Sequence, residues 1–173
     1  MATRIKDEFM QHIAEESAWQ DLSKSFAWTE ALLEKHCEKV DWKKISENES
    51  IMWSIPMLHK FSKKVDWNLL SRQICKNDWF TEAHLEEFKD KWNWTEVTEN
   101  IIYHEYLFTN EIIDKYLDYW NWDSLIEGGI PDNPIDFFNK YKDRISMSKL
   151  QNSRLWWDII NHTANKIKSK FLS

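Results

Sequence analysis

The sequence predicts an all-α fold built from repeated pairs of helices. Three observations support this prediction: short motifs return at nearly regular intervals, apolar positions within each copy follow helical spacing, and glycine is almost absent. The 173 residues include 12 Trp but only 2 Gly and 3 Pro, and no segment shows the sustained alternation of a β-strand. We therefore expect a right-handed or superhelical α-solenoid of about six helix–turn–helix repeats of roughly 25 residues, followed by a C-terminal capping helix.

One motif marks the second helix of each pair. It consists of Asp or Asn, then Trp, two variable residues, an aliphatic residue and usually a hydroxyl residue. Its Trp position falls at residues 42, 67, 94 and 122. A weaker copy places Trp19 there and a degenerate copy places Met147 there, so the six positions are separated by 23, 25, 27, 28 and 25 residues. Asp and Asn are favourable N-caps, so each copy predicts a short helix that begins at the Trp.

A second motif, an aromatic residue followed by Thr or Ser, marks the first helix. Counted from the hydroxyl residue, apolar side chains recur at +4, +7 and +11, as in Thr29, Leu33, His36 and Val40. This spacing predicts one face of a helix of about ten residues, capped by the Thr or Ser. His36 occupies a position that is aromatic in the other copies, and we interpret it as a packing residue. Each unit would then be a longer helix, a tight turn and a shorter helix.

The repeats define the expected organisation of the chain. Residues 1–173 form a single repeat domain, in which 1–23 is a degenerate first unit, 26–126 holds four clear repeats, 127–150 is a degenerate last unit and 151–173 is the capping helix. Both glycines lie in the linker 128–134, where a helix C-cap and turn explain them. Ser153 is expected to cap the last helix, whose predicted apolar side carries Trp156, Ile160, Thr163, Ile167 and Phe171.

With these motifs the chain resembles Trp-rich helical-repeat proteins of bacteria, phages and giant viruses. The resemblance covers about residues 6 to 150, although the first and last units depart from the pattern. It supports a repeat array. Because that family is uncharacterised, the resemblance implies no activity, cofactor or catalytic residue.

Composition and charge exclude several functions. Two adjacent glycines cannot form a glycine-rich phosphate loop, and a net charge of −6 is unfavourable for binding a phosphate backbone. No apolar run has the length of a membrane-spanning helix, and the first residues lack the apolar stretch of a secretory signal. Cys37 and Cys75, without a CxxC pair, suit a reducing cytosol as small core residues. We expect a cytoplasmic protein that binds neither membrane nor nucleic acid directly.

No catalytic constellation is visible. GxSxG and HExxH motifs are absent, and no base can be assigned to Cys37 or Cys75. His84 and Glu87, three residues apart on one helix, resemble half of a metal site, but a second pair of ligands is missing. We predict no enzyme, no catalytic residue, no metal and no cofactor.

Four aromatic residues outside the repeated positions are the predicted partner-binding residues: Tyr103, Tyr106, Tyr119 and Trp157. Exposed Tyr and Trp are frequent anchors of protein interfaces. The alternative, that these side chains only fill wider gaps between units, is equally consistent with the sequence. The predicted function is a non-catalytic protein–protein interaction module, and in a sharper form an inhibitor, immunity or anti-defence factor that blocks another protein. Two alternatives are a metal-dependent hydrolase with its site between repeats and a structural piece of a larger assembly.

Overall fold

The computed structural model describes residues 7–73, 79–104 and 106–171. Within these ranges the chain is helical and has no β-strand, which confirms the all-α part of the prediction. In the same ranges no helix combines the length and apolarity needed to cross a membrane. The chain divides into two compact units, Met1–Trp92 and Asn93–Ser173, and each is described by itself.

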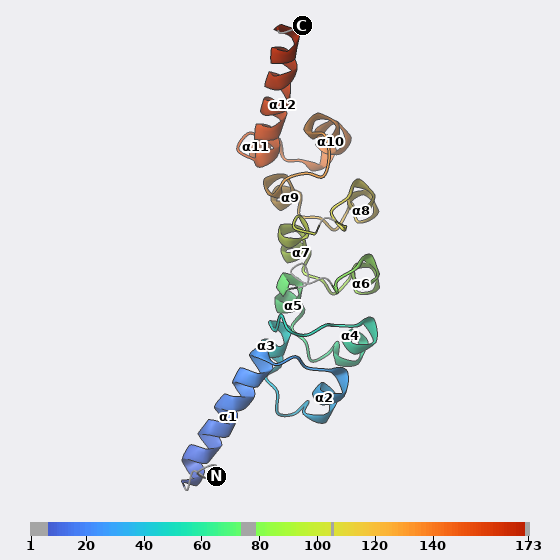
Figure 1. The fold of residues 1–173 in the computed structure, drawn as a ribbon. Helices are drawn as coiled ribbons and strands as arrows, with labels where there is room; N and C mark the ends of the chain where they lie inside the picture. Colours follow the sequence, from blue (N-terminus) through green and yellow to red (C-terminus); the bar gives the residue numbers. More distant parts are fainter. Residues whose placement is uncertain (1–6, 74–78, 105, 172–173) are drawn as a thin grey trace. The chain divides into compact units, whose positions relative to one another are not determined.

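Unit one contains two rows of helices (Figure 1). The first row comprises helices that begin after Thr or Ser, namely α2 (Glu30–Lys35), α4 (Ile55–Phe61) and α6 (Glu82–Glu87). The second row comprises helices that carry the repeated Trp, namely α1 (Glu8–Ser25), α3 (Trp42–Ser46) and α5 (Trp67–Gln73). In the second row α1 contacts α3, and α3 contacts α5.

Unit two continues the same alternation. Its first-row helices are α8 (Asn110–Lys115) and α10 (Pro134–Tyr141), and a 3-10 turn, η2 (Lys142–Arg144), follows α10. Its second-row helices are α7 (Trp94–Ile101), α9 (Trp122–Gly128) and the short α11 (Met147–Leu150). The chain then enters α12 (Arg154–Phe171), which contacts α9 and α10.

The predicted N-caps of the clear repeats are confirmed with one exception. The degenerate copies depart from the prediction, because Trp19 lies inside the single helix α1 and Ser146 makes no capping hydrogen bond before α11. Side-chain oxygens accept backbone N–H groups of the first turn at Thr29, Asp41, Ser54, Asp66, Asn93, Thr109 and Asn121. Ser153 likewise accepts from the N–H of Trp156 at 3.3 Å. Thr81 precedes α6 but makes no capping hydrogen bond, because its hydroxyl lies 2.9 Å from Nδ1 of His84.

The prediction of ten-residue first helices was wrong. The first-row helices of the clear repeats have only six or seven residues, and the backbone leaves the helical conformation at His36, Phe88 and Tyr116. The +11 positions are nevertheless buried, but they lie in the turn that leads to the next Trp; they are Val40, Val65, Trp92 and Trp120. The helical spacing therefore holds only to +7, and a turn supplies the last apolar side chain.

A buried hydroxyl group at the last position of the Trp motif joins one sequence repeat to the next repeat of the same unit. Ser46 Oγ donates a hydrogen bond to the carbonyl oxygen of Trp42 at 2.7 Å and accepts one from the backbone N–H of Asp66 at 2.9 Å. Ser23 joins Trp19 to Asp41 in this way, and Thr98 joins Trp94 to Asn121. We call this arrangement the hydroxyl relay. It explains why a small hydroxyl residue follows the Trp at this spacing.

The side chains of three motif tryptophans, Trp42, Trp67 and Trp122, are each engaged on two sides. The indole N–H of Trp42 donates to the carbonyl of Cys37 at 2.9 Å, and its ring lies 5.1 Å from that of Phe61. The same ring contact with the next first-row aromatic residue recurs at Trp67 with Phe88, Trp94 with Tyr116 and Trp122 with Tyr141. His36 takes this place against Trp19 at 5.2 Å, which confirms its interpretation as a packing residue.

Candidate functional site

Three of the four predicted partner-binding aromatic residues are strongly exposed. Tyr103 and Tyr106 follow α7 and are 78% and 87% exposed, and Trp157 on α12 is 67% exposed. A turn holds Tyr103 in place, because its N–H donates to the carbonyl of Asn100 at 3.2 Å. The structure therefore places these rings on the surface of unit two, two of them in the segment after α7 and one on α12.

Tyr119 has a different environment. It is half-buried, and its ring lies 4.8 Å from that of Trp94. In three preceding repeats a lysine ammonium occupies the corresponding place over the motif Trp, at 5.4 to 5.8 Å from the ring centre. These lysines are Lys39, Lys64 and Lys91. A cation over an aromatic face and a second aromatic ring both stabilise such a position. Tyr119 thus belongs to the packing of its repeat.

An apolar groove that the sequence did not predict lies beside α2. It has a cavity volume of about 200 Å³ and is lined by Trp19, Leu22, Phe26, Trp28, Leu32 and His36. We call it the α2 groove. The sequence signal that could have revealed this groove lies in the first repeat, residues 1–23, which lacks the aromatic–Thr start of a first-row helix. In the described residues, α2 therefore has a first-row neighbour on one side only.

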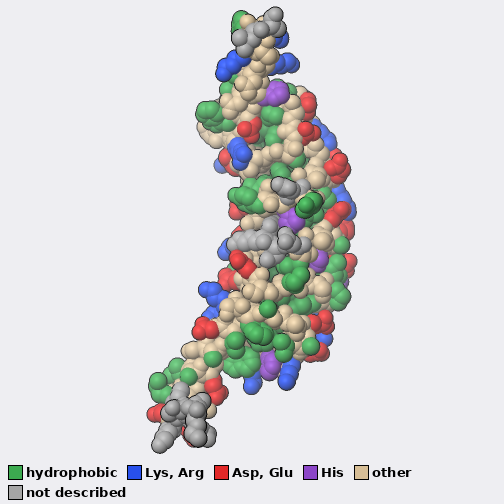
Figure 2. All heavy atoms as spheres, in the orientation of Figure 1, with side chains coloured by type: hydrophobic (Ala, Val, Ile, Leu, Met, Phe, Trp, Pro, Cys, Tyr) green, Lys and Arg blue, Asp and Glu red, His purple; other side chains and the backbone are tan. Residues whose placement is uncertain are grey.

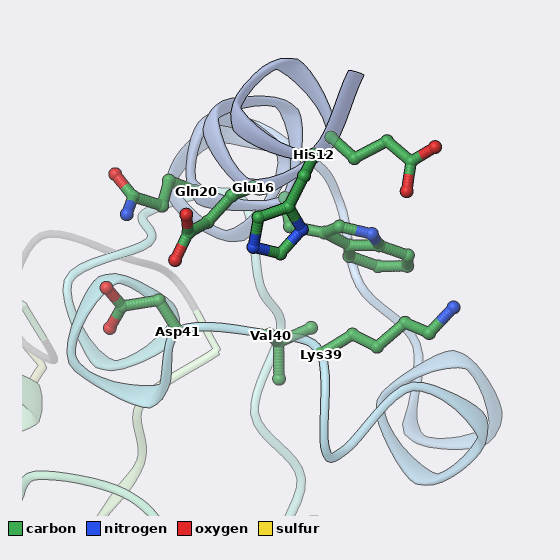
Figure 3. A pocket seen from close by; sticks show the side chains of 8 residues that line it. His12, Glu16, Gln20, Lys39, Val40 and Asp41 are labelled. Atoms are coloured by element: carbon green, nitrogen blue, oxygen red, sulfur yellow. The ribbon is translucent and has the colours of Figure 1, made fainter. Parts of the chain in front are cut away.

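A second, polar groove lies between α1 and the segment that precedes α3 (Figure 3). It has a volume of about 500 Å³, and His12, Glu15, Glu16, Trp19, Gln20, Lys39, Val40 and Asp41 line it. Two of its charged groups already have structural roles. The carboxylate of Asp41 caps α3, accepting from Lys43 N–H at 3.0 Å, and the ammonium of Lys39 lies over Trp19. Three carboxylates and one lysine line the groove, so its surface is predominantly acidic.

The structure does not bring His84 and Glu87 together as metal ligands. His84 is buried, and its Nε2 lies 3.1 Å from the carbonyl oxygen of Trp53. A carbonyl oxygen only accepts, so Nε2 carries the proton and Nδ1 accepts from the Thr81 hydroxyl. Burial lowers the pKa of His84, against a smaller opposing effect of the Trp53 carbonyl. Glu87 instead pairs with His59 at 2.6 Å.

Metal-ligating residues do not cluster in the described parts of the chain. Over residues 7–73, 79–104 and 106–171, no three side chains of His, Cys, Asp or Glu lie close enough together to hold a metal ion.

Cys37 is not the small core residue that we expected. Its thiol is half-exposed and donates to Glu38 Oε1 at 3.3 Å, and this hydrogen bond raises the pKa of Cys37. A nucleophilic cysteine requires the opposite shift. Cys75 lies outside the described residues.

These contacts define the chain as an all-helical protein in which one set of packing interactions recurs from unit to unit. Comparisons with protein families, curated proteins and solved structures find no match.

Proposed function

We propose that the chain is a non-catalytic protein-binding module built as an α-solenoid of about six repeats. In this proposal Tyr103, Tyr106 and Trp157 contact the partner. The observation that carries it is the division of the aromatic side chains into two groups. Those at repeated positions pack against one another, whereas these three are exposed and have no role in the repeat.

The solenoid arrangement is supported by the contacts between successive helices. Within unit one, α3 contacts α1 on one side and α5 on the other, and the hydroxyl relay joins the same neighbours. Within unit two, α7 contacts α9 and the relay of Thr98 reaches Asn121. Stabilisation by nearest neighbours is what allows such an array to present an extended surface.

The charge distribution favours a basic partner. The chain carries 29 acidic and 23 basic side chains. A polar pocket of about 450 Å³ in unit two is lined by Glu99, Asp123, Ser124, Glu127, Gly128 and Lys149. Carboxylates therefore predominate there, as they do in the polar groove beside α1. Complementary charge steers association and selects partners. The clefts of nucleic-acid-binding enzymes are basic, and an acidic surface of this chain could occupy such a cleft. This complementarity supports the sharper proposal of an inhibitor, immunity or anti-defence factor.

The test is affinity capture from the cells in which the protein occurs, with wild type and variants compared quantitatively. We expect at least one protein to be enriched by wild type and lost about tenfold or more on Tyr103→Ala/Tyr106→Ala, as truncation of an interface anchor requires. Met52→Ala is the matched control, because Met52 is 77% exposed and lies in unit one. Equal capture by all three forms would refute this binding surface.

The inhibitor form has its own test. Purified chain is titrated into the captured enzyme, or into a neighbouring toxin or nuclease, and activity is measured. Loss of activity at a one-to-one ratio, relieved by the tyrosine double variant, is the expected result. Activity that stays constant contradicts inhibition while leaving binding intact.

A further inference from the structure

The predicted apolar side of α12, which we call the α12 stripe, is largely exposed to solvent. It carries Trp156, Ile160, Thr163, Ile167 and Phe171. Of the helix's 18 residues only Leu155 is buried, whereas Ile160 and Ile167 are about half exposed and Phe171 is 83% exposed. The predicted stripe therefore does not pack as a whole onto the repeats, and the contacts with α9 and α10 leave much of it in solvent. Helices of this length draw most of their stability from packing an amphipathic face. The stripe has the properties of a surface that another helix covers.

α1 is similarly exposed but carries the opposite charge. It buries only Ser23, and Phe9 is 70% exposed. Four carboxylates and one lysine lie on α1, namely Glu8, Glu15, Glu16, Asp21 and Lys24. Four basic side chains and one carboxylate lie on α12, namely Arg154, Lys166, Lys168, Lys170 and Asp158. The two terminal helices are therefore complementary in charge.

The α2 groove has the properties of a binding surface for an additional helix. On its other side, α2 is joined to α4 by Lys60, whose ammonium lies 3.0 and 2.8 Å from Glu30 and Glu34. Met57 on α4 is buried, whereas Leu32, which occupies the same repeat position on α2, is partly exposed and lines the groove. A further apolar helix placed there would complete for α2 the environment that α4 already has.

We propose that α12 of a second copy of the chain binds in the α2 groove, with its apolar stripe on the groove and its lysines near the carboxylates of α1. Parallel pairing of two α12 helices would bring Lys166, Lys168 and Lys170 of each copy close to those of the other. Antiparallel pairing would place these lysines near Arg154 and a single carboxylate, Asp158, so neither arrangement matches the four carboxylates of α1. An anionic membrane surface attracts basic helices but repels a chain of net charge −6. Since groove and helix are different surfaces, the contact is heterologous and leaves one of each free.

The test is sedimentation velocity of the full chain over a range of concentrations. The mean mass rises with concentration for wild type and falls as salt is added, because the pairing is partly ionic. Ile167→Asp on the stripe and Phe26→Asp at the groove each weaken association at least about tenfold, since each buries a charge. Met52→Asp, an exposed apolar position outside both surfaces, leaves association unchanged. Circular dichroism verifies that helix content is retained.

A mixing experiment identifies the geometry. Ile167→Asp retains its groove and Phe26→Asp retains its helix, so their mixture forms a dimer although neither variant associates alone. Pairing between two α12 helices would instead leave Phe26→Asp associating by itself, which overturns the proposal. A variant with Lys166, Lys168 and Lys170 replaced by Glu associates more weakly. Mixing it with a second variant, in which Glu8, Glu15 and Glu16 are replaced by Lys, restores association.

Two further results would overturn self-association. One is the mass of a single chain at every concentration. The other is α12-dependent binding to anionic vesicles without any increase in mass. Both can be obtained whether or not Tyr103 and Tyr106 bind a partner, so failure here is distinguishable from failure of the proposed function.

Discussion

Replacement of Ser46 by Ala tests the hydroxyl relay directly. The Ser46 side chain is fully buried and makes two hydrogen bonds, one within α3 to the carbonyl of Trp42 and one from the N–H of Asp66 in the next unit. Alanine removes both and adds no bulk. The variant therefore isolates the hydrogen bonds from the apolar packing around them.

The expected loss follows from what each partner retains. The Trp42 carbonyl lies inside α3, where a helical backbone hydrogen bond also reaches it. The Asp66 amide loses its acceptor in a partly buried place. Leaving a buried donor unsatisfied costs about 1 to 3 kcal/mol. We expect Ser46→Ala to lower the free energy of unfolding by that amount, and Ser46→Thr to lose less, since Thr98 serves the same purpose in unit two.

Urea unfolding followed by circular dichroism measures this loss, with Ser25→Ala as the matched control. Ser25 Oγ donates to the carbonyl of Asp21 at 2.9 Å, four residues earlier as in the relay, but it is exposed and serves no neighbouring unit. Its replacement should cost about 0.5 kcal/mol or less. Equal losses for Ser46→Ala and Ser25→Ala would refute the relay as a connection between units.

Three further predictions use the same unfolding assay. Tyr119→Lys should change the free energy of unfolding by no more than about 1 kcal/mol, because a lysine lies over the motif Trp in three other repeats. A larger loss would contradict the equivalence of tyrosine and lysine at this position. Burial keeps the pKa of His84 below its ordinary value of 6.5, so the unfolded chain binds the proton first. Stability should therefore fall as the pH drops below about 6.5, and His84→Asn should flatten this slope; an unchanged slope would contradict the assignment. Gly129→Ala should cost about 1 kcal/mol or more, because Gly129 has φ of 111°, a conformation that side chains disfavour. A neutral result would show that the linker adapts.

The sequence predicted helix starts well because a cap is a local interaction. Asp41 and Thr29 act on N–H groups two or three residues away, so their identity and spacing suffice. Thr81 failed because its hydroxyl lies next to His84, a competing partner at that one copy of the motif. Helix length failed for a different reason: spacing locates the buried side chain of Val40 but does not reveal that a turn, rather than a helix, carries it there.

The candidate surfaces were predicted less completely. Tyr103, Tyr106 and Trp157 could be singled out because they stand outside the repeat, and all three are exposed. The α2 groove depends on which side of α2 lacks a neighbour, and that is a property of three-dimensional packing. Tyr119 shares its position with lysines, and only the ring geometry revealed that both residue types pack on a Trp.

The hydroxyl relay also gives the chain a direction. At the starts of α3 and α5, the N–H of Asp41 or Asp66 has no glutamate three residues later to accept it, and a hydroxyl of the preceding unit does so instead. These two amides should therefore exchange slowly with deuterium only while the preceding unit is folded. Opening of one repeat exposes the first amide of the next, so deuterium exchange at Asp41 and Asp66 reports the opening of the preceding repeat as well as of their own.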